Sequence, residues 1–435
     1  MRRAQNASEM LEAIRSMTPD LVVHILAPQV ETLFGAVGAR SGFVDVGGLF
    51  LDLGGGSVQM TYMDTSGIQK LGSNEQVGYE VSAALAGESL PFGAARLIKI
   101  LEGADPETQA LEISKLKTGM VEAFANLRKV FPSLSDAISA AQQAHTTEGN
   151  ESDTGIDVYL CGGGFRGYGS MLMHNDPIQP YPMSSIGSYV VSGKLFSRTK
   201  EMLEINNMFK GKIFGLSKRR RAQFPAIVTV VQALIEAVPH IRSVTFCAGG
   251  NREGALMMML PREIRESNPL SHLHTHTEPL LSLKYSTENS VLHDVMDAIS
   301  SALPENVDHA PMTVFSLHLG ALYTSQVWTH VGDDADANAS ASLHDAISHN
   351  PGCPGLTHLA RAVLGLTRCA RWGAYLGPAD QQLYQSLRTL VTRADPRALF
   401  WIDYIGAITA VLASVVTCWP RNQGAIQNTI RCVQP

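Results

Sequence analysis

Apolar and polar positions follow their clearest pattern over residues 48–63. An apolar run at 49–51 reaches Asp52, and three glycines and Ser57 come next. Over residues 58–62 apolar and polar side chains then alternate, as they do in a strand with one buried face. The pattern therefore predicts two strands joined by a glycine-rich turn.

Elsewhere the spacing of apolar residues predicts mostly helices. Asp105 followed by Pro106 is typical of a helix start, and we expect this helix to end before Pro132. Residues 21–26 are mostly apolar and rich in residue types that favour strands, so they predict a strand. The pattern also predicts helices at 9–17, 30–37, 217–239 and 255–260, strands at 157–161 and 243–246, and a polar loop at 143–155.

Two more predicted strands run into glycine-rich turns. Gly162, Gly163 and Gly164 follow one of them, and the segment 249–254 follows the other. Residues 162–167 also match the G-x-G-x-x-G pattern of dinucleotide-binding folds, but no acidic residue stands about 20 positions on, where the ribose partner belongs. Three units of strand and glycine turn together predict a cleft lined by backbone amides.

The first glycine turn carries the most suggestive chemistry. Gly54, Gly55 and Gly56 can bring their N–H groups together around an anion, because they have no side chain and tolerate positive φ. Asp52 and Ser57 would then flank this cradle, placed for a hydrated metal ion and a phosphate oxygen respectively. The alternative is an ordinary hairpin turn, although two residues already suffice for that.

The character of the chain changes at about residue 266. Segment 267–278 predicts a linker, and most of the remaining sequence predicts helices with faces rich in Ala, Leu and Val. His272, His274 and His276 alternate, so a metal site on one strand face is an alternative to a plain linker. The acidic segment 331–342 predicts a solvated loop, because it lacks the glycine and glutamate of a calcium loop.

Composition narrows the class of protein. The 435 residues are 45% hydrophobic and 17% charged, which is enough chain for two or three domains with their own cores. The net charge of -6 argues against a general nucleic-acid binder. Six cysteines without any C-x-x-C, and a start without an apolar signal region, predict reduced thiols in a cytoplasmic protein.

Two charge features need separate interpretation. Residues 405–419 carry no charge, but the run is shorter than the ~20 residues of a spanning helix, so we expect a buried helix and no membrane. The basic residues 218–221 stand out on an acidic chain. They could attract polyphosphate, act as a nuclear-localisation patch or form a solvated helix end.

The segment L-D-L-G-G-G-S resembles the second phosphate loop of the exopolyphosphatase and guanosine-pentaphosphate phosphatase (Ppx/GppA) family, within the actin, sugar kinase and Hsp70 superfamily. Other segments resemble this family in the same order along the chain. They resemble its fungal branch more closely than its other members. They are R-R-A-Q-N-A at 2–7, L-A-P-Q-V-E-T-L-F-G at 26–35, P-F-G-A-A-R-L at 91–97, the stretch 216–234 and R-E-G at 252–254.

The resemblance implies roles for the candidate residues. Glu31 would be the catalytic base, and Asp52 would hold Mg²⁺ through water. The loop 54–57 would bind the terminal phosphate of the substrate. Gly162, Gly163 and Gly164 would bind the rest of the chain or a nucleotide, and Arg252 belongs to the same phosphate-binding set.

The resemblance also implies a fold. We expect an α/β protein with actin-like ATPase (ribonuclease H-like) lobes and an all-α C-terminal domain. The family's first phosphate loop, D-x-G-S-N/T, has no counterpart in the sequence, so the first lobe should be truncated. The predicted domains are residues 1–40, the remnant of the first lobe; 41–265, the second lobe; and 266–435, the helical domain.

Two functions agree with this resemblance. One is a regulatory member of the fungal branch in mitochondria-to-nucleus signalling, which binds polyphosphate or a nucleotide such as ATP or guanosine polyphosphate and reports it to a protein partner, with residual hydrolysis. The other is an active Mg²⁺-dependent phosphohydrolase. Gln59 and Val30, where the family has glutamates, favour the regulator, whereas Glu31 and the intact glycine loop favour the enzyme. We further expect a homodimer and no specific nucleic acid.

Overall fold

The computed structural model describes residues 6–43, 46–65, 78–146, 154–266, 285–304, 312–348 and 356–420. The chain divides into two compact units. Unit 1 comprises residues 1–41, 45–172 and 189–266, and unit 2 comprises residues 42–44, 173–188 and 267–435. Each unit has its own buried core.

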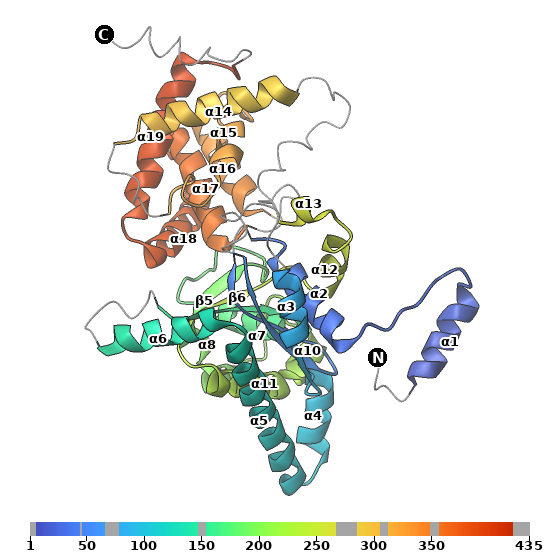
Figure 1. Ribbon diagram of the computed structural model, residues 1–435. Helices are drawn as coiled ribbons and strands as arrows, with labels where there is room; N and C mark the ends of the chain where they lie inside the picture. Colours follow the sequence, from blue (N-terminus) through green and yellow to red (C-terminus); the bar gives the residue numbers. More distant parts are fainter. Residues whose placement is uncertain are drawn as a thin grey trace. The chain divides into compact units, whose positions relative to one another are not determined.

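Unit 1 is built on a mixed six-stranded sheet in the order β3-β2-β1-β4-β6-β5 (Figure 1). Strands β1, β4 and β6 run parallel, while β2, β3 and β5 pair antiparallel with their neighbours. The strands are β1 (Gly47–Leu53), β2 (Val58–Asp64), β3 (Glu88–Leu90), β4 (Ile156–Cys161), β5 (Tyr189–Ser192) and β6 (Ile241–Phe246).

Helices connect and cover these strands. In chain order they are α1 (Ala7–Met17), α2 (Pro28–Arg40), α3 (Tyr79–Ala86), α4 (Ala94–Gly103), α5 (Pro106–Val130), α6 (Pro132–Thr146), α7 (Gly162–His174), α8 (Gly193–Phe196), α9 (Thr199–Met208), α10 (Lys218–Ala222), α11 (Phe224–Ala237), α12 (Asn251–Met257) and α13 (Arg262–Glu266). α5 begins where the sequence predicts, because Asp105 accepts the Thr108 N–H as an N-cap.

Unit 2 is helical in its described residues (Figure 1). Its helices are α14 (Tyr285–Ser301), α15 (Gly320–Ser325), α16 (Ala335–Ile347), α17 (His358–Arg371), α18 (Pro378–Ala394) and α19 (Ala398–Val415). α17 supplies the centre of the core, with Val363, Leu364 and Leu366 among its buried side chains. The α/β class and the helical C-terminal region are thus confirmed, whereas the truncated first lobe and the exact domain bounds stay predictions.

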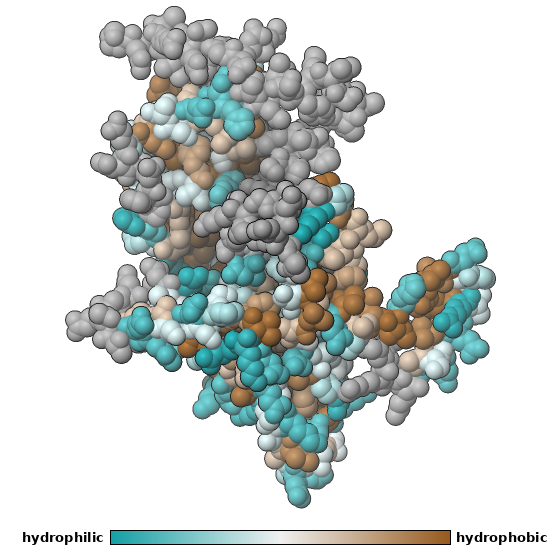
Figure 2. Space-filling view, viewed as in Figure 1, coloured by the Kyte–Doolittle hydropathy of each residue, from teal (hydrophilic) through white to brown (hydrophobic). Residues whose placement is uncertain are grey.

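Several local predictions are wrong. Residues 21–26 form no strand: four of their five apolar side chains are exposed, and none of the described strands pairs with them. α1 likewise buries none of its residues, and Figure 2 shows apolar surface along it. The predicted loop at 331–342 is largely helical from Ala335, since Asn338 binds the turn before it through its side-chain amide.

The predicted loop at 143–155 also needs revision, because α6 continues to Thr146 and the start of the loop is therefore helical. The predicted linker 267–278, with its three histidines, lies outside the described residues. Both the linker and the metal alternative for those histidines stay predictions.

The alternation in β2 misleads on exposure. It predicts an exposed face for Gln59 and Thr61, but both side chains are buried, since both faces of this strand are covered. Their polar groups are satisfied instead: Thr61 donates to the Ala83 carbonyl, and Gln59 donates to Ser57. A strand that is buried on both faces can thus keep polar residues at alternate positions, because side-chain hydrogen bonds offset the cost of burying them.

The prediction of a buried helix at 405–419 is half right. The run belongs to α19, which ends at Val415 and buries one face, whereas Phe400 and Val411 are exposed. Among the described residues, this is the one helix whose length and composition would suffice to cross a membrane, a test that the core helix of a soluble protein also passes.

Candidate functional site

The glycine loop between β1 and β2 is held by the start of α4. The amides of Ala94, Ala95 and Arg96 donate to the carbonyl oxygens of Gly54 and Gly55. Gly93 touches the loop so closely that a Cβ there would collide with the backbone of Gly55 and Gly56. The loop carbonyls therefore face α4, and within the described part of the chain the amides of Gly55, Gly56 and Ser57 have no protein acceptor.

The Ser57 hydroxyl is oriented by Gln59. The Gln59 side-chain amide donates to Ser57 Oγ at 2.7 Å. Because the hydroxyl oxygen is occupied as an acceptor, its own hydrogen is left to donate outward. A glutamate at position 59 would instead accept that hydrogen, so the glutamine found here favours an anion-binding Ser57.

Asp52 is the next-to-last residue of β1, and several residues pack closely against its carboxylate. A Cβ on Gly162, which has φ of 84°, would collide with Asp52 Oδ1, and a Cβ on Gly35 would lie 3.6 Å from Asp52 Oδ2. The Asn251 amide donates to Asp52 Oδ2 at 3.2 Å. Burial, followed by the charge of Glu31, raises the pKa of Asp52 to about 6.

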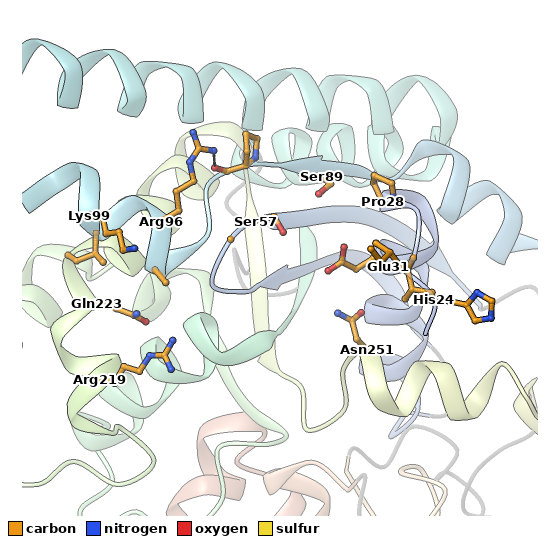
Figure 3. Close-up of a pocket in the computed structure, with 16 residues that line it drawn as sticks. His24, Pro28, Glu31, Ser57, Ser89, Arg96, Lys99, Arg219, Gln223 and Asn251 are labelled. Carbon is orange, nitrogen blue, oxygen red and sulfur yellow. Dashed lines mark hydrogen bonds between the residues drawn. The ribbon is translucent and has the colours of Figure 1, made fainter. Parts of the chain in front are cut away.

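Glu31 lies in the first turn of α2, and its place depends on close helix packing. A Cβ on Gly38 would collide with the Gly250 carbonyl, and one on Gly254 with the Phe34 carbonyl. Only glycine allows this approach, which fixes α2 against α12. Figure 3 shows the Glu31 carboxylate directed into the space between Ser57 and Asn251.

Glu31, Ser57 and Asn251 line a cavity of about 1060 Å³ in unit 1 (Figure 3), whereas Asp52, Gly54 and Gly55 are not among its lining residues. Its cationic side chains come from α4 and α10, namely Arg96, Lys99 and Arg219. The other lining residues are His24, Ile25, Leu26, Pro28, Glu31, Gly56, Ser57, Ser89, Pro91, Ala95, Ile98, Gln223 and Asn251. The Arg96 guanidinium donates to the Pro91 carbonyl and pairs with Glu112 at 3.6 Å. An anion in this cavity would therefore meet bare amides, a hydroxyl and the charges of Lys99 and Arg219.

Not every predicted residue reaches the cavity lining. Gly162 packs against Asp52, Gly163 lies near Arg220, and Gly164 packs against the Leu53 side chain. Arg252 is exposed on α12, and its neighbour Asn251 lines the cavity instead. The motifs do not single out Asn251, Arg96 or Lys99, although Arg96 lies within the family-like segment 91–97.

The site offers carboxylates to a cation but no complete ligand set. Within the described residues no group of three or more His, Cys, Asp and Glu side chains could hold a metal ion. Burial raises the pKa of Asp52 and the charge of Glu31 raises it further, and a divalent cation would relieve the repulsion between the two carboxylates. The two carboxylates thus fit a hydrated Mg²⁺ held largely through water.

The profile of the Ppx/GppA phosphatase family matches residues 1–263, and the profile of the RTG2 C-terminal domain matches residues 278–432. The first match covers more than half of the chain. This chain belongs to the Ppx/GppA phosphatase family, as its motifs predict.

Within that family, the chain is similar to Retrograde regulation protein 2 of Saccharomyces cerevisiae. The two are 30% identical over 426 residues, which span 95% of this chain and 65% of that relative. The chain thus covers just under two thirds of the relative's length.

Solved structures give a weaker likeness. An exopolyphosphatase from Cytophaga hutchinsonii is 17% identical with a TM-score of 0.38, covering 59% of this chain and 71% of that one. The type II variant of the Aquifex aeolicus Ppx/GppA phosphatase is 17% identical with a TM-score of 0.36, over the same shares of each chain. Similarity at this level supports no statement about ligands.

Proposed function

We propose that this chain binds the phosphates of polyphosphate or of a nucleotide, such as ATP or guanosine polyphosphate, and acts as a regulator in mitochondria-to-nucleus signalling. One observation carries the binding proposal. The amides of Gly56 and Ser57, the Ser57 hydroxyl and three cationic side chains border the same cavity as Glu31. Backbone amides and cations of this kind are the groups that bind phosphate in proteins.

The signalling part of the proposal rests on the similarity to Retrograde regulation protein 2. A protein partner that responds to the bound phosphate, a homodimer and a cytoplasmic location complete this proposal. A pull-down with and without tripolyphosphate tests it, and capture of a partner under only one of the two conditions would support it. Capture that is the same under both conditions would contradict phosphate-dependent signalling.

Hydrolysis is the second candidate function, and Glu31 is the observation in its favour. A water placed between Glu31 and the terminal phosphorus would attack that phosphorus and pass a proton to the Glu31 carboxylate. The bridging P–O bond would break, so that orthophosphate and a chain shorter by one phosphate leave. Mg²⁺ near Asp52 would neutralise charge on the phosphates.

Two measurements on one preparation separate the candidates. Phosphate release from polyphosphate, ATP and guanosine pentaphosphate is followed with Mg²⁺, and binding of the same ligands is measured by calorimetry. Turnover supports the enzyme, and binding without turnover supports the regulator. Ser57→Ala should weaken phosphate binding about tenfold, because the hydrogen bond from the Ser57 hydroxyl to a charged phosphate oxygen is lost. Ser139→Ala, at an exposed serine, is the control. Absence of any phosphate binding would overturn both.

A further inference from the structure

The first helix of unit 1, α1, has an apolar face that lies outside the core. Met10, Ile14 and Met17 follow one another at helical spacing, and the helix buries none of its residues. Met17 is 84% exposed. Because an isolated helix of 11 residues is only marginally stable in water, α1 needs a surface to pack on if it is to stay helical.

The segment 18–27 joins α1 to α2 and is also largely exposed. It contains no helix or strand, and its Leu21 and Val22 side chains face solvent. An extended segment of this length spans about 33 Å. We call residues 7–27 the arm, since they can reach a neighbouring molecule.

A second exposed apolar surface lies on α3 and α12, and we call it the acceptor surface. Its side chains on α3 are Val81 and Leu85, one helical turn apart. Leu256 of α12 and Met259, directly after that helix, complete it. Leu85 is 77% exposed and Met259 is 80% exposed. Figure 2 shows apolar surface where these helices lie.

The acceptor surface is held in place from below and from the side. Both α3 and α12 pack against α2. Arg265 of α13 donates to both carboxylate oxygens of Glu80 in α3, at 2.7 and 2.8 Å, and so ties the segment after α12 to α3. Methionine fits many partner shapes, because its side chain is unbranched and polarizable. The surface thus suits an apolar helix face.

The charges of the arm and of the acceptor surface are complementary. The arm has one arginine and three carboxylates, those of Glu9, Glu12 and Asp20. Arg252 is exposed one turn before Leu256, beside the acceptor surface. The neighbouring Glu253 accepts the Gly250 N–H at 2.9 Å and is thus engaged at the start of its own helix. Complementary charges favour this pairing and its orientation.

We propose that two copies of this chain exchange their arms, so that α1 of each copy packs on α3 and α12 of the other. Each chain carries one arm and one acceptor surface, so a two-fold exchange covers both surfaces on both chains and closes the assembly. A stable interface buries about 1,200–2,000 Å² in total, and each of two identical contacts supplies half of that. An unrelated protein on the acceptor surface would leave α1 uncovered.

This inference gives the homodimer of the proposed function its interface, and it does not depend on phosphate binding. The test is sedimentation equilibrium of the full chain over a range of concentrations. Ile14→Asp changes the arm, and Met259→Asp changes the acceptor surface. Leu111→Asp, at an exposed leucine of α5, is the matched control. Circular dichroism checks the fold of each variant.

We expect the wild type and Leu111→Asp to be dimers. Ile14→Asp and Met259→Asp should each raise the dissociation constant about a hundredfold or more, because a carboxylate would be buried in both contacts. A one-to-one mixture of these two variants should dimerise again. The arm of the Met259→Asp chain and the acceptor surface of the Ile14→Asp chain still form one intact contact.

Wild-type dimerisation of both Ile14→Asp and Met259→Asp would overturn the exchange and leave the homodimer to another interface. If the mixture stays as monomeric as each variant alone, the exchange is overturned as well, because the arm and the acceptor surface then do not meet between chains. A monomeric wild type would overturn the exchange together with the proposed homodimer. The phosphate binding of the proposed function is measured separately and stands or falls by itself.

Discussion

The side-chain amide of Asn251 donates to Asp52 Oδ2 at 3.2 Å, although 199 residues separate them in the chain. The contact joins the end of β1 to the start of α12. It also supports a carboxylate that burial alone would disfavour in its charged form. The ionised Asp52 carboxylate therefore destabilises the folded protein, and a bound cation would offset this cost.

The first prediction concerns Asp52→Asn. The folded-state pKa is about 6 against an ordinary value of 3.8, so the folded protein binds more protons than the unfolded chain between these values. Protonation of Asp52 therefore adds to the free energy of unfolding at low pH, and this contribution is lost as the pH rises through about 6. Asp52→Asn should therefore raise the melting temperature by a few degrees at pH ~7.5 and change it little at pH ~4.5.

Thermal unfolding at both pH values, with and without Mg²⁺, checks this. Mg²⁺ should raise the melting temperature of the wild type at the higher pH and leave that of Asp52→Asn unchanged. The exposed Asp136→Asn serves as control. A variant less stable than the wild type at the higher pH would contradict a destabilising carboxylate at this position.

The second prediction concerns the packing of α2 on α12. Gly38→Ala places a methyl group on the Gly250 carbonyl, so one helix must shift, at a cost of about 1–3 kcal/mol or more. The shift should also displace Glu31 from the cavity and weaken phosphate binding. Gly103→Ala is the matched control, because nothing lies within 4 Å of a Cβ there. It should be neutral or slightly stabilising.

Denaturant unfolding and calorimetry with tripolyphosphate measure both effects of Gly38→Ala. If this variant keeps wild-type stability and affinity, the glycine contact is not the feature that places Glu31.

Local sequence signals predict most of the structure near the first glycine loop. The turn 54–57, Glu31 on a helix and the glycine turn before α12 all follow from residue type and periodicity. The exact convergence of these segments depends on the strand order β1-β4-β6, and nothing local in the sequence specifies which strands are neighbours. Only the recurrence of glycine turns after several strands indicates a common cleft.

The cationic residues that line the cavity are harder to predict from the sequence than the glycine loop. Arg96 and Lys99 look like ordinary polar positions of an amphipathic helix, and only the packing of α4 on the loop brings them to the cavity. Residues 21–26 fail for the opposite reason. Their composition favours a strand, but a strand exists only beside another strand that pairs with it, and none of the described strands pairs with residues 21–26.

The third prediction applies if phosphate release is observed. Glu31→Gln should reduce kcat about 10²–10⁴-fold, because the amide cannot accept the proton of the attacking water. Binding of tripolyphosphate should change little, since the cationic wall and the loop amides remain. Calorimetry and a phosphate-release assay on the same samples check this, with the exposed Glu107→Gln as control. An unchanged rate would exclude Glu31 as the base.

The last prediction concerns unit 2, where His358 is a buried neutral base. Its Nε2 faces the Gly187 carbonyl at 3.2 Å and therefore donates, so Nδ1 accepts from the Tyr181 hydroxyl at 2.9 Å. Burial lowers the pKa of His358 to about 3, from an ordinary value of 6.5. Between these values the unfolded chain binds the extra proton, so stability should fall as the pH drops below about 6.5, by about 1.4 kcal/mol per pH unit.

All four tryptophans of the chain lie within residues 267–435, so tryptophan fluorescence reports the unfolding of unit 2. Denaturant titrations from pH ~7 to pH ~4.5 should show this slope in the wild type and in the control His330→Gln. His358→Gln should be less stable near neutral pH but lose less stability on acidification, because glutamine takes up no proton in the unfolded state. Parallel pH profiles for the wild type and His358→Gln would show that His358 is protonated in the folded protein and that its two hydrogen bonds are not those of a neutral ring.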